Sequence, residues 1–290
     1  MSASSRIGKG YVLASTYISG MIIVIILAFL VSNSWDAITH AGWQLFSETW
    51  NPPKGKFGIL PMIYGSLAVT VIALLIAVPL GLLTAIFTAE MLPPRLRLYV
   101  KSMLELLAGI PSIIFGLIGV VFFSAWIQTL FDLQSGRTIL TAGVLLAMMV
   151  LPTIITLSDD ALHNVPRQYR KAAGGLGLYK YEVIMSAVLP NARTDILGAV
   201  LLALGRSLGE TMAVMLVIGS IDKIPAPLFN FLVPAQTITS KLGREIAETA
   251  FGSLHFSAMI FMGLILLIFV LTLTFVSLTF FYNPEQRLYE

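Results

Sequence analysis

Residues 196–220 read ILGAVLLALGRSLGETMAVMLVIGS, an apolar run of membrane length that carries one guanidinium and one carboxylate. At about 1.5 Å of rise per residue, a helix over this run would cross a hydrocarbon layer roughly 30 Å thick and place Arg206 near its middle. An Arg at that depth costs about 2.5 to 3.5 kcal/mol on insertion scales, so it usually faces a protein interior or a water-filled path. The run therefore predicts a membrane helix that serves a solute pathway.

The whole chain has the composition of a membrane protein. Charged residues make up 11% of its 290 residues and hydrophobic residues 57%, with a mean hydropathy of +0.88, whereas a soluble domain carries about 25% charged residues. We predict an all-α polytopic protein whose six transmembrane helices cover residues 11–31, 61–88, 102–125, 138–157, 196–220 and 257–281. The expected regions are a tail, the first helix and an external loop over residues 1–60, a five-helix core over 61–282, and a tail over 283–290.

Lys and Arg are distributed unequally between alternate loops. They are more numerous in the N-terminal tail, the loop after the second predicted helix, the loop over residues 158–191 and the C-terminal tail than in the remaining loops. Under the positive-inside rule, both termini then lie in the cytoplasm. No A-x-A site follows the first apolar run, so we expect this helix to stay attached as an anchor.

Several kinds of site are not indicated. The chain has no Cys, and its three His residues are scattered without ligand spacing, so neither a disulfide nor a metal site is expected. No Gly-x-x-x-x-Gly-Lys-Ser/Thr sequence occurs, so the chain lacks the usual loop that cradles ATP phosphates. The net charge of +3 and the pI near 9.1 arise in loops beside apolar runs, where membrane orientation accounts for them without nucleic-acid binding.

The predicted outer loops are rich in aromatic residues. Trp35, Trp43 and Trp50 suit the headgroup level of a bilayer, and the Asn-Pro-Pro-Lys-Gly stretch that follows would end any helix. These residues either anchor the chain in the lipid bilayer or form a docking rim for an external partner. A short surface helix within residues 237–251 would belong to the same rim.

The longest predicted cytoplasmic loop, residues 158–191, reads SDDALHNVPRQYRKAAGGLGLYKYEVIMSAVLPN. Its polar start, its small residues and its closing Leu-Pro predict two short helices joined by a glycine turn at residues 174–177. Small side chains would let a partner surface approach the backbone closely. The alternative is a pair of helices that packs only against its own bundle.

The spacing within this loop resembles the EAA loop of the inner-membrane permeases of ABC importers. Lys171 stands where that family usually has Glu, and Ala187 where it usually has Ile. In the family this loop forms the coupling helix that sits in a cleft of the ATPase subunit. The resemblance implies that the coupling residues are Lys171, Ala172, Ala173, Gly174, Gly177, Leu189 and Pro190.

Two further stretches narrow the resemblance. Residues 106–117, LLAGIPSIIFGL, and residues 205–214, GRSLGETMAV, resemble the phosphate-specific transport permeases, and the Glu-Thr-Met-Ala-Val ending is closer to the PstC type than to the PstA type. This resemblance implies a type I ABC importer permease fold in a bacterial inner membrane. It also implies three partners: a homologous permease of the PstA type, two ATPase subunits that hold ATP and Mg, and a periplasmic or extracellular phosphate-binding protein.

Four residues of the 205–211 segment are candidates for the substrate pathway. On a continuous helix, Arg206 and Glu210 would share one face, and Ser207 and Thr211 the face beside it. A guanidinium matches an oxygen pair of phosphate bidentately, and a carboxylate can accept a hydrogen bond from protonated phosphate but repels fully ionised sulfate. Glu210 is therefore either a selectivity element or only the ion-pair partner of Arg206 that fixes helix packing.

Pro111 interrupts the third apolar run. It produces either a simple kink or a half-helix whose amides point at an anion, with the Ser112 hydroxyl as an added donor. We include Ser112 among the expected pathway residues for this reason.

Together these features favour a permease subunit that accepts phosphate from an external binding protein, while ATP is hydrolysed on another chain. Three alternatives stay open: a permease for another oxyanion such as sulfate or molybdate, an ATP-independent anion transporter or channel, and a membrane scaffold in which Arg206 and Glu210 only lock the bundle.

Overall fold

The computed structural model describes residues 3–281, most of which are helical. Six helical stretches are long and apolar enough to cross a membrane, which confirms the predicted number of spans. The expected tail over residues 283–290 lies outside the described residues. The helices that contain these stretches are α1 (Ala3–Ala41), α2 (Leu60–Glu90), α4 to α5 (Ser112–Leu130), α6 (Ile139–Asn164), α8 to α9 (Lys180–Gly209) and α12 (Leu254–Phe281).

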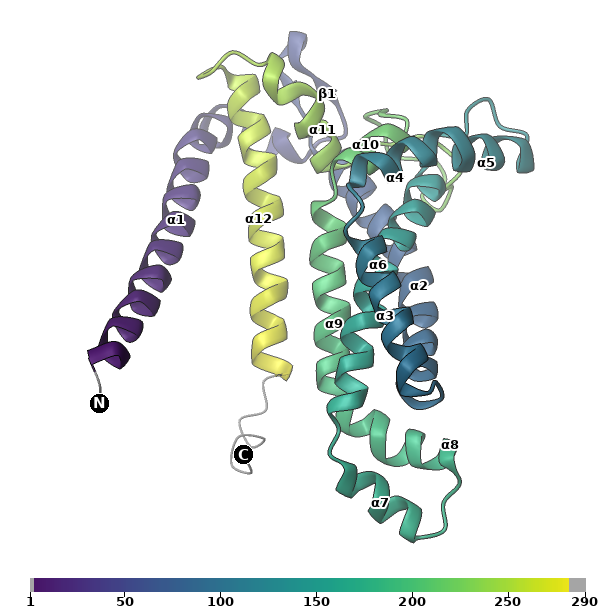
Figure 1. Cartoon of the computed structure of the whole chain (residues 1–290). Helices are drawn as coiled ribbons and strands as arrows, with labels where there is room; N and C mark the ends of the chain where they lie inside the picture. Colours follow the sequence, from purple (N-terminus) through teal and green to yellow (C-terminus); the bar gives the residue numbers. More distant parts are fainter. Residues whose placement is uncertain (1–2, 282–290) are drawn as a thin grey trace.

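The centre of the bundle is the pair α2 and α6, which run side by side (Figure 1). Two glycines make the close contact possible. A Cβ on Gly81 would lie 2.7 Å from the Ile154 side chain, and one on Gly143 would lie 2.5 Å from the Ile72 side chain. Small residues at such positions let membrane helices approach closely and gain packing contacts. The largest buried cluster is built around this pair and is completed by α4, α9 and α10.

The third span differs from the prediction of a helix over residues 102–125. A separate helix, α3, covers Pro94–Ala108, and a new helix begins at Ser112. Gly109, Ile110 and Pro111 form the break between them, because Pro111 has no amide hydrogen to donate. The membrane span is therefore α4 (Ser112–Ile118), a π-helical turn (Gly119–Ser124) and α5 (Ala125–Leu130).

The fifth span also differs from the prediction, which placed one helix over residues 196–220. The helix α9 (Leu189–Gly209) begins earlier and ends at Gly209. Glu210 is extended, with φ −69° and ψ 123°, and α10 (Met212–Val217) starts two residues later. The shared helix face expected for Arg206 and Glu210 is therefore absent, because the helix stops between them.

The end of the bundle away from α7 and α8 is a layer of short elements. The hairpin of β1 (Trp50–Asn51) and β2 (Lys56–Phe57) pairs antiparallel, and α11 (Ile238–Glu245) lies beside it (Figure 1). The helix expected within residues 237–251 is thus present. Short 3₁₀ turns complete the layer at Gly42–Phe46, Pro52–Lys54 and Ile246–Glu248.

The opposite end carries the α7 and α8 segment. The helices α7 (Arg167–Gly175) and α8 (Lys180–Val183) are joined by a turn in which Gly177 has φ +79°, and a π-helical turn (Ile184–Val188) leads into α9. This agrees with the two short helices expected from the sequence. The first seven residues of the predicted loop, 158–164, instead form the last turns of α6.

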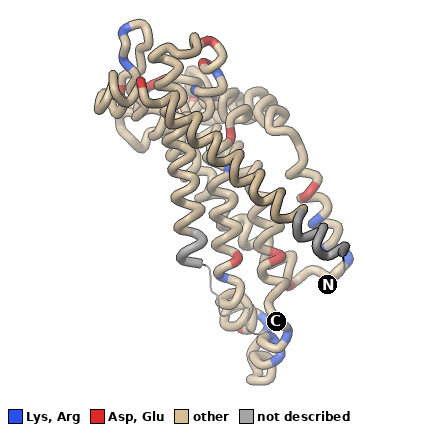
Figure 2. Tube along the Cα trace, turned by 90° about the vertical axis from the view of Figure 1, so that its left-hand side faces the viewer, with Lys and Arg blue, Asp and Glu red and all other residues tan. Residues whose placement is uncertain are grey.

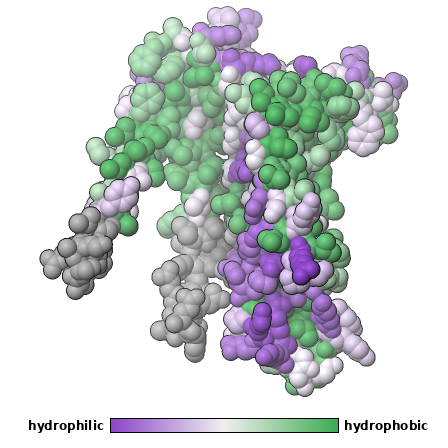
Figure 3. All heavy atoms as spheres, in the orientation of Figure 1, coloured by the Kyte–Doolittle hydropathy of each residue, from purple (hydrophilic) through white to green (hydrophobic). Residues whose placement is uncertain are grey.

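The polarity of the surface follows this arrangement. Charged residues gather toward the two ends of the helix bundle, and few lie along the helices between those ends (Figure 2). Hydrophobic side chains cover α4 and α5, whereas hydrophilic ones gather over α7 and α8 (Figure 3). α1 begins, and α12 ends, toward the end that carries α7 and α8 (Figure 1).

Candidate functional site: a broken helix beside a polar cavity

The break between α9 and α10 is held by Glu210. Its carboxylate Oε1 accepts a hydrogen bond from the backbone N–H of Ala213 at 3.2 Å, which satisfies one of the free amides at the start of α10. Its backbone carbonyl accepts a hydrogen bond from the Thr239 hydroxyl at 2.8 Å. Glu210 therefore connects α9, α10 and the start of α11, and the break is a built feature of the fold.

Arg206 lies in the last turn of α9 and is exposed on the surface of the single chain. Within residues 3–281, no ion pair joins it to Glu210. The hypothesis of an Arg206–Glu210 ion pair is therefore wrong for this structure. The guanidinium can instead meet an anion, lipid or another chain.

A small polar cavity of about 10 Å³, room for roughly one water molecule, lies against the break. Ser207 and Glu210 contribute to its wall, and the Ser207 hydroxyl donates to the Ala203 carbonyl at 2.8 Å. The other polar lining residues come from α2 and from the start of α11: Ser66, Thr70, Thr237 and Thr239. Hydroxyl residues from α2, α9 and the start of α11 thus line this cavity together with Glu210.

These four hydroxyl residues were missed by sequence reasoning. Ser66 and Thr70 are four residues apart on α2, a spacing that puts two polar groups on one face of an apolar helix and could have signalled the site. Ser66 accepts a hydrogen bond from the Ile238 N–H at 2.9 Å and so fixes the start of α11. Gly65 allows this approach, because a Cβ there would lie 2.0 Å from the Gln236 carbonyl oxygen.

The remaining predicted pathway residues lie at the edge of this region. Thr211 is half-buried, and its hydroxyl donates to the Gly209 carbonyl at 3.3 Å. Ser112 is the first residue of α4 and does not line the cavity. The helix that it begins does reach the site, since a Cβ on Gly116 would lie 3.0 Å from the Ala213 Cα. The structure therefore brings α4 against α10 but does not place Ser112 beside Glu210.

The predicted coupling residues divide into exposed and buried ones. Lys171, Ala172, Gly174, Gly177 and Pro190 are exposed, Leu189 is half-buried, and Ala173 is buried. Tyr179 and Tyr181 are exposed as well, and their rings are stacked with centroids 6.2 Å apart. An accessible face with small residues and two aromatic rings is suited to contact with another protein.

The α7 helix is tied back to the membrane helices by Arg170. Its guanidinium pairs with Glu90 at the end of α2 and donates to the Leu162 carbonyl of α6 at 2.7 Å. Beside it lies an open hollow of about 350 Å³, lined by Ala89, His163, Arg167, Arg170 and Lys171. A displacement of α7 would therefore be transmitted to both α2 and α6.

A second cluster of charged residues lies at the opposite end of the bundle, beside α11. The Lys241 ammonium is buried, pairs with Asp222 and Glu245, and lies 5.1 Å from the centre of the Trp50 ring. Burial raises the pKa of Asp222 above its ordinary value, while the hydrogen bond from Lys241 acts in the opposite direction. The cluster joins the loop after α10 to α11 and the β-hairpin.

Comparison with known proteins identifies the family. Residues 77–288 match the family described as binding-protein-dependent transport system inner membrane component. The chain belongs to this family. It is 39% identical to the phosphate transport system permease protein PstC of Mesorhizobium japonicum, over 89% of this chain and 85% of that protein. It is 35% identical to PstC of Pasteurella multocida, over 89% and 85% of the two chains.

Solved structures agree on the fold. A bacterial ABC transporter for alginate import superposes with a TM-score of 0.62 and 14% identity, over 95% of this chain and 98% of that one. The MetNI methionine transporter in an inward-facing conformation superposes with a TM-score of 0.59 and 16% identity, over 77% and 94%. This member of the family therefore has the type I ABC importer permease fold and is a multi-pass protein of the inner membrane.

Proposed function

We propose that this ABC importer permease carries phosphate, and that the substrate passes the break at residues 209–211 between Arg206 and Glu210. The observation that carries the proposal is the break itself. Irregular backbone at membrane depth is tolerated where it is buried in protein or lines a water-filled cavity, and broken helices build the substrate sites of many transporters. Two PstC-named relatives that are 39% and 35% identical to this chain over the aligned residues support phosphate as the substrate.

The chemistry of the break suits an anion that keeps a proton. The guanidinium of Arg206 offers a fork of donors that can hold two phosphate oxygens. Glu210 uses one oxygen to hold Ala213, which leaves its other oxygen to accept a hydrogen bond from the phosphate proton. Fully ionised sulfate offers no proton, so the same carboxylate repels it. The hydroxyls of Ser207 and Thr211 now donate their single hydrogens to the Ala203 and Gly209 carbonyls, so each would have to rotate to donate to phosphate.

Transport in this proposal needs other chains. A permease of the PstA type completes the pathway, so that the exposed Arg206 faces the partner across it. Two ATPase subunits bind ATP and Mg and act on the exposed face of α7, with Lys171, Ala172 and Gly174 at the contact. A periplasmic or extracellular phosphate-binding protein delivers the substrate at the end that carries α11, and both termini lie in the cytoplasm.

Uptake by the reconstituted complex tests the proposal. The chain is assembled with its ATPase, its partner permease and its binding protein in proteoliposomes, and uptake of phosphate, arsenate and sulfate is measured with and without ATP. We expect ATP-dependent uptake of phosphate and arsenate only. Preferential sulfate uptake would identify sulfate instead of phosphate as the substrate, and ATP-independent uptake would exclude an ATP-driven importer.

A further inference from the structure

The helix α3 meets the bundle with two cations and two apolar side chains. None of its residues is buried, and Arg97, Val100, Lys101 and Leu104 line the small pocket that α3 forms with α2 and α6. These positions are three and four residues apart and so lie on one helix face. Two of the four are cations, and each meets a carboxylate of α6.

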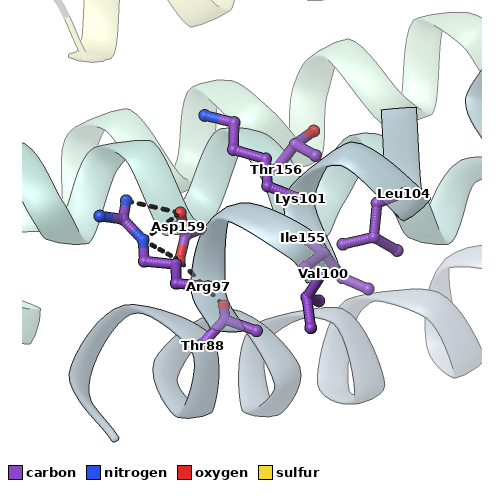
Figure 4. A pocket seen from close by; sticks show the side chains of 8 residues that line it. All are labelled: Thr88, Arg97, Val100, Lys101, Leu104, Ile155, Thr156 and Asp159. Atoms are coloured by element: carbon purple, nitrogen blue, oxygen red, sulfur yellow. Dashed lines mark hydrogen bonds and ion pairs between the residues drawn. The ribbon is translucent and has the colours of Figure 1, made fainter. Parts of the chain in front are cut away.

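The stronger of the two pairs is Arg97 with Asp159 (Figure 4). The Asp159 side chain is 4% exposed, and Arg97 donates to it from Nε at 3.0 Å and from Nη2 at 2.7 Å. The Thr88 hydroxyl of α2 donates to the same carboxylate at 2.9 Å. A forked guanidinium pair with a third donor has a fixed geometry, so three helices are held at one point.

The remaining nitrogen of Arg97 is also engaged. Nη1 lies 2.8 Å from Nδ1 of His163, and because a guanidinium can only donate, Nδ1 is the acceptor in this contact. The neighbouring pair, Lys101 with Asp160, is much more open, since the side chain of Asp160 is 46% exposed. The two adjacent carboxylates of α6 therefore offer a buried pair and an exposed pair of otherwise similar chemistry.

Both ends of this connection lead to functional segments. α6 continues through Val165 and Pro166 directly into α7, which Arg170 also ties to α2 and α6. α3 continues through the break at Gly109 into α4, whose Gly116 packs against Ala213 of α10, three residues after Glu210. The charged contact thus lies between the loop that faces other chains and the helix that begins at the candidate substrate site.

We propose that Asp159 and Arg97 form a joint that makes α3 move with α6, and that this joint positions α4 against α10 beside Glu210 during transport. Asp159 and Arg97 are positioning residues, because neither touches the proposed substrate site. The inference rests on the proposed function, since it takes α7 as the segment on which the ATPase acts.

The test compares Asp159→Asn and Arg97→Lys with the matched control Asp160→Asn in the full reconstituted complex. Arg97→Lys keeps the charge and loses the fork, so it serves if Asp159→Asn does not assemble. The first readout is the amount of phosphate taken up per ATP hydrolysed. A merely stabilising pair would lower uptake and hydrolysis together, as the amount of folded complex falls.

We expect the phosphate taken up per ATP hydrolysed to fall about tenfold in both joint variants, in the range of measured coupling effects. In the control it should stay within about twofold of the unmodified complex.

A second readout does not depend on the anion. Because the chain has no Cys, spin labels on Met103→Cys of α3 and Met148→Cys of α6, both exposed residues, report one interhelix distance. We expect a single narrow distance with and without ATP, and a broadened one in Asp159→Asn.

An unchanged ratio and distance in Asp159→Asn, or equal losses in the Asp160→Asn control, would overturn the joint. An unmodified complex that hydrolyses ATP without phosphate uptake would contradict the proposed function instead. The spin-label distances would still decide whether α3 and α6 are coupled.

Discussion

The Glu210 carboxylate accepts a hydrogen bond from the Ala213 backbone N–H at 3.2 Å, so the residue that carries the negative charge also holds the start of α10. Charge and hydrogen bonding at this position can be separated, because a Gln side chain keeps an acceptor oxygen and loses the charge.

We expect Glu210→Gln to assemble normally and to lose the discrimination between phosphate and sulfate, since the repulsion of sulfate is removed. Glu210→Ala should in addition destabilise the chain by about 0.5 to 2 kcal/mol, the usual cost of a lost cap. Competition uptake and thermal unfolding in detergent measure the two effects. Retained discrimination in Glu210→Gln would assign Glu210 a structural role alone.

Replacing Arg206 should affect transport more than folding. Its side chain is exposed and makes no ion pair within the described residues, so Arg206→Ala removes no ion pair there. We expect phosphate uptake to fall at least about tenfold in Arg206→Ala, which corresponds to about 1.4 kcal/mol, and to be partly restored in Arg206→Lys, which keeps the charge without the fork. If Arg206→Ala takes up phosphate as fast as the unmodified chain, Arg206 has no direct role in the substrate pathway.

The turn between α7 and α8 depends on Gly177. Its φ of +79° is unfavourable for a residue with a Cβ, so Gly177→Ala should distort the turn at a cost of about 1 kcal/mol or more. Gly198→Ala is the control, because a Cβ there meets nothing within 4 Å and the residue lies inside α9, outside the α7 and α8 segment. We expect weaker copurification with the ATPase for Gly177→Ala only. Equal binding by both variants would argue against this turn as the docking element.

The raised pKa of Asp222 predicts a pH dependence of stability. A carboxyl whose folded-state pKa is raised binds its proton more tightly in the folded chain, so its contribution to stability is complete below about pH 3.8 and is lost as the pH rises through the folded-state value. The stability of the unmodified chain relative to Asp222→Asn should therefore increase as the pH falls from 7 toward 4. Melting temperatures across this range give the sign, and a decrease would contradict it.

The number of membrane helices could be predicted because hydropathy alone determines which stretches enter the bilayer. The break at residues 209–211 could not, since the apolar pattern around it continues and the break is fixed by contacts from Ala213 and Thr239. At Gly109 to Pro111 the sequence signalled an interruption, but whether it is a kink or a full break depends on how α3 and α4 pack.

Asp159 was missed for a similar reason. Two consecutive carboxylates suggested that the fourth helix had ended by Leu157, whereas the structure continues α6 to Asn164 and buries Asp159. Its partner Arg97 is 62 residues away, and no local pattern connects the two. The α7 and α8 helices were predicted correctly because their turn is encoded locally by glycine.

The unequal burial of the spans bears on how the chain is made. The apolar window of α1 has no buried residues, so α1 can settle in lipid as an independent helix while synthesis continues. The window of α6 is 67% buried, and its Asp159 needs Thr88 and Arg97, which are synthesised before it. The donors for this carboxylate are thus already synthesised when it leaves the ribosome, so they are available to pair with it as α6 packs.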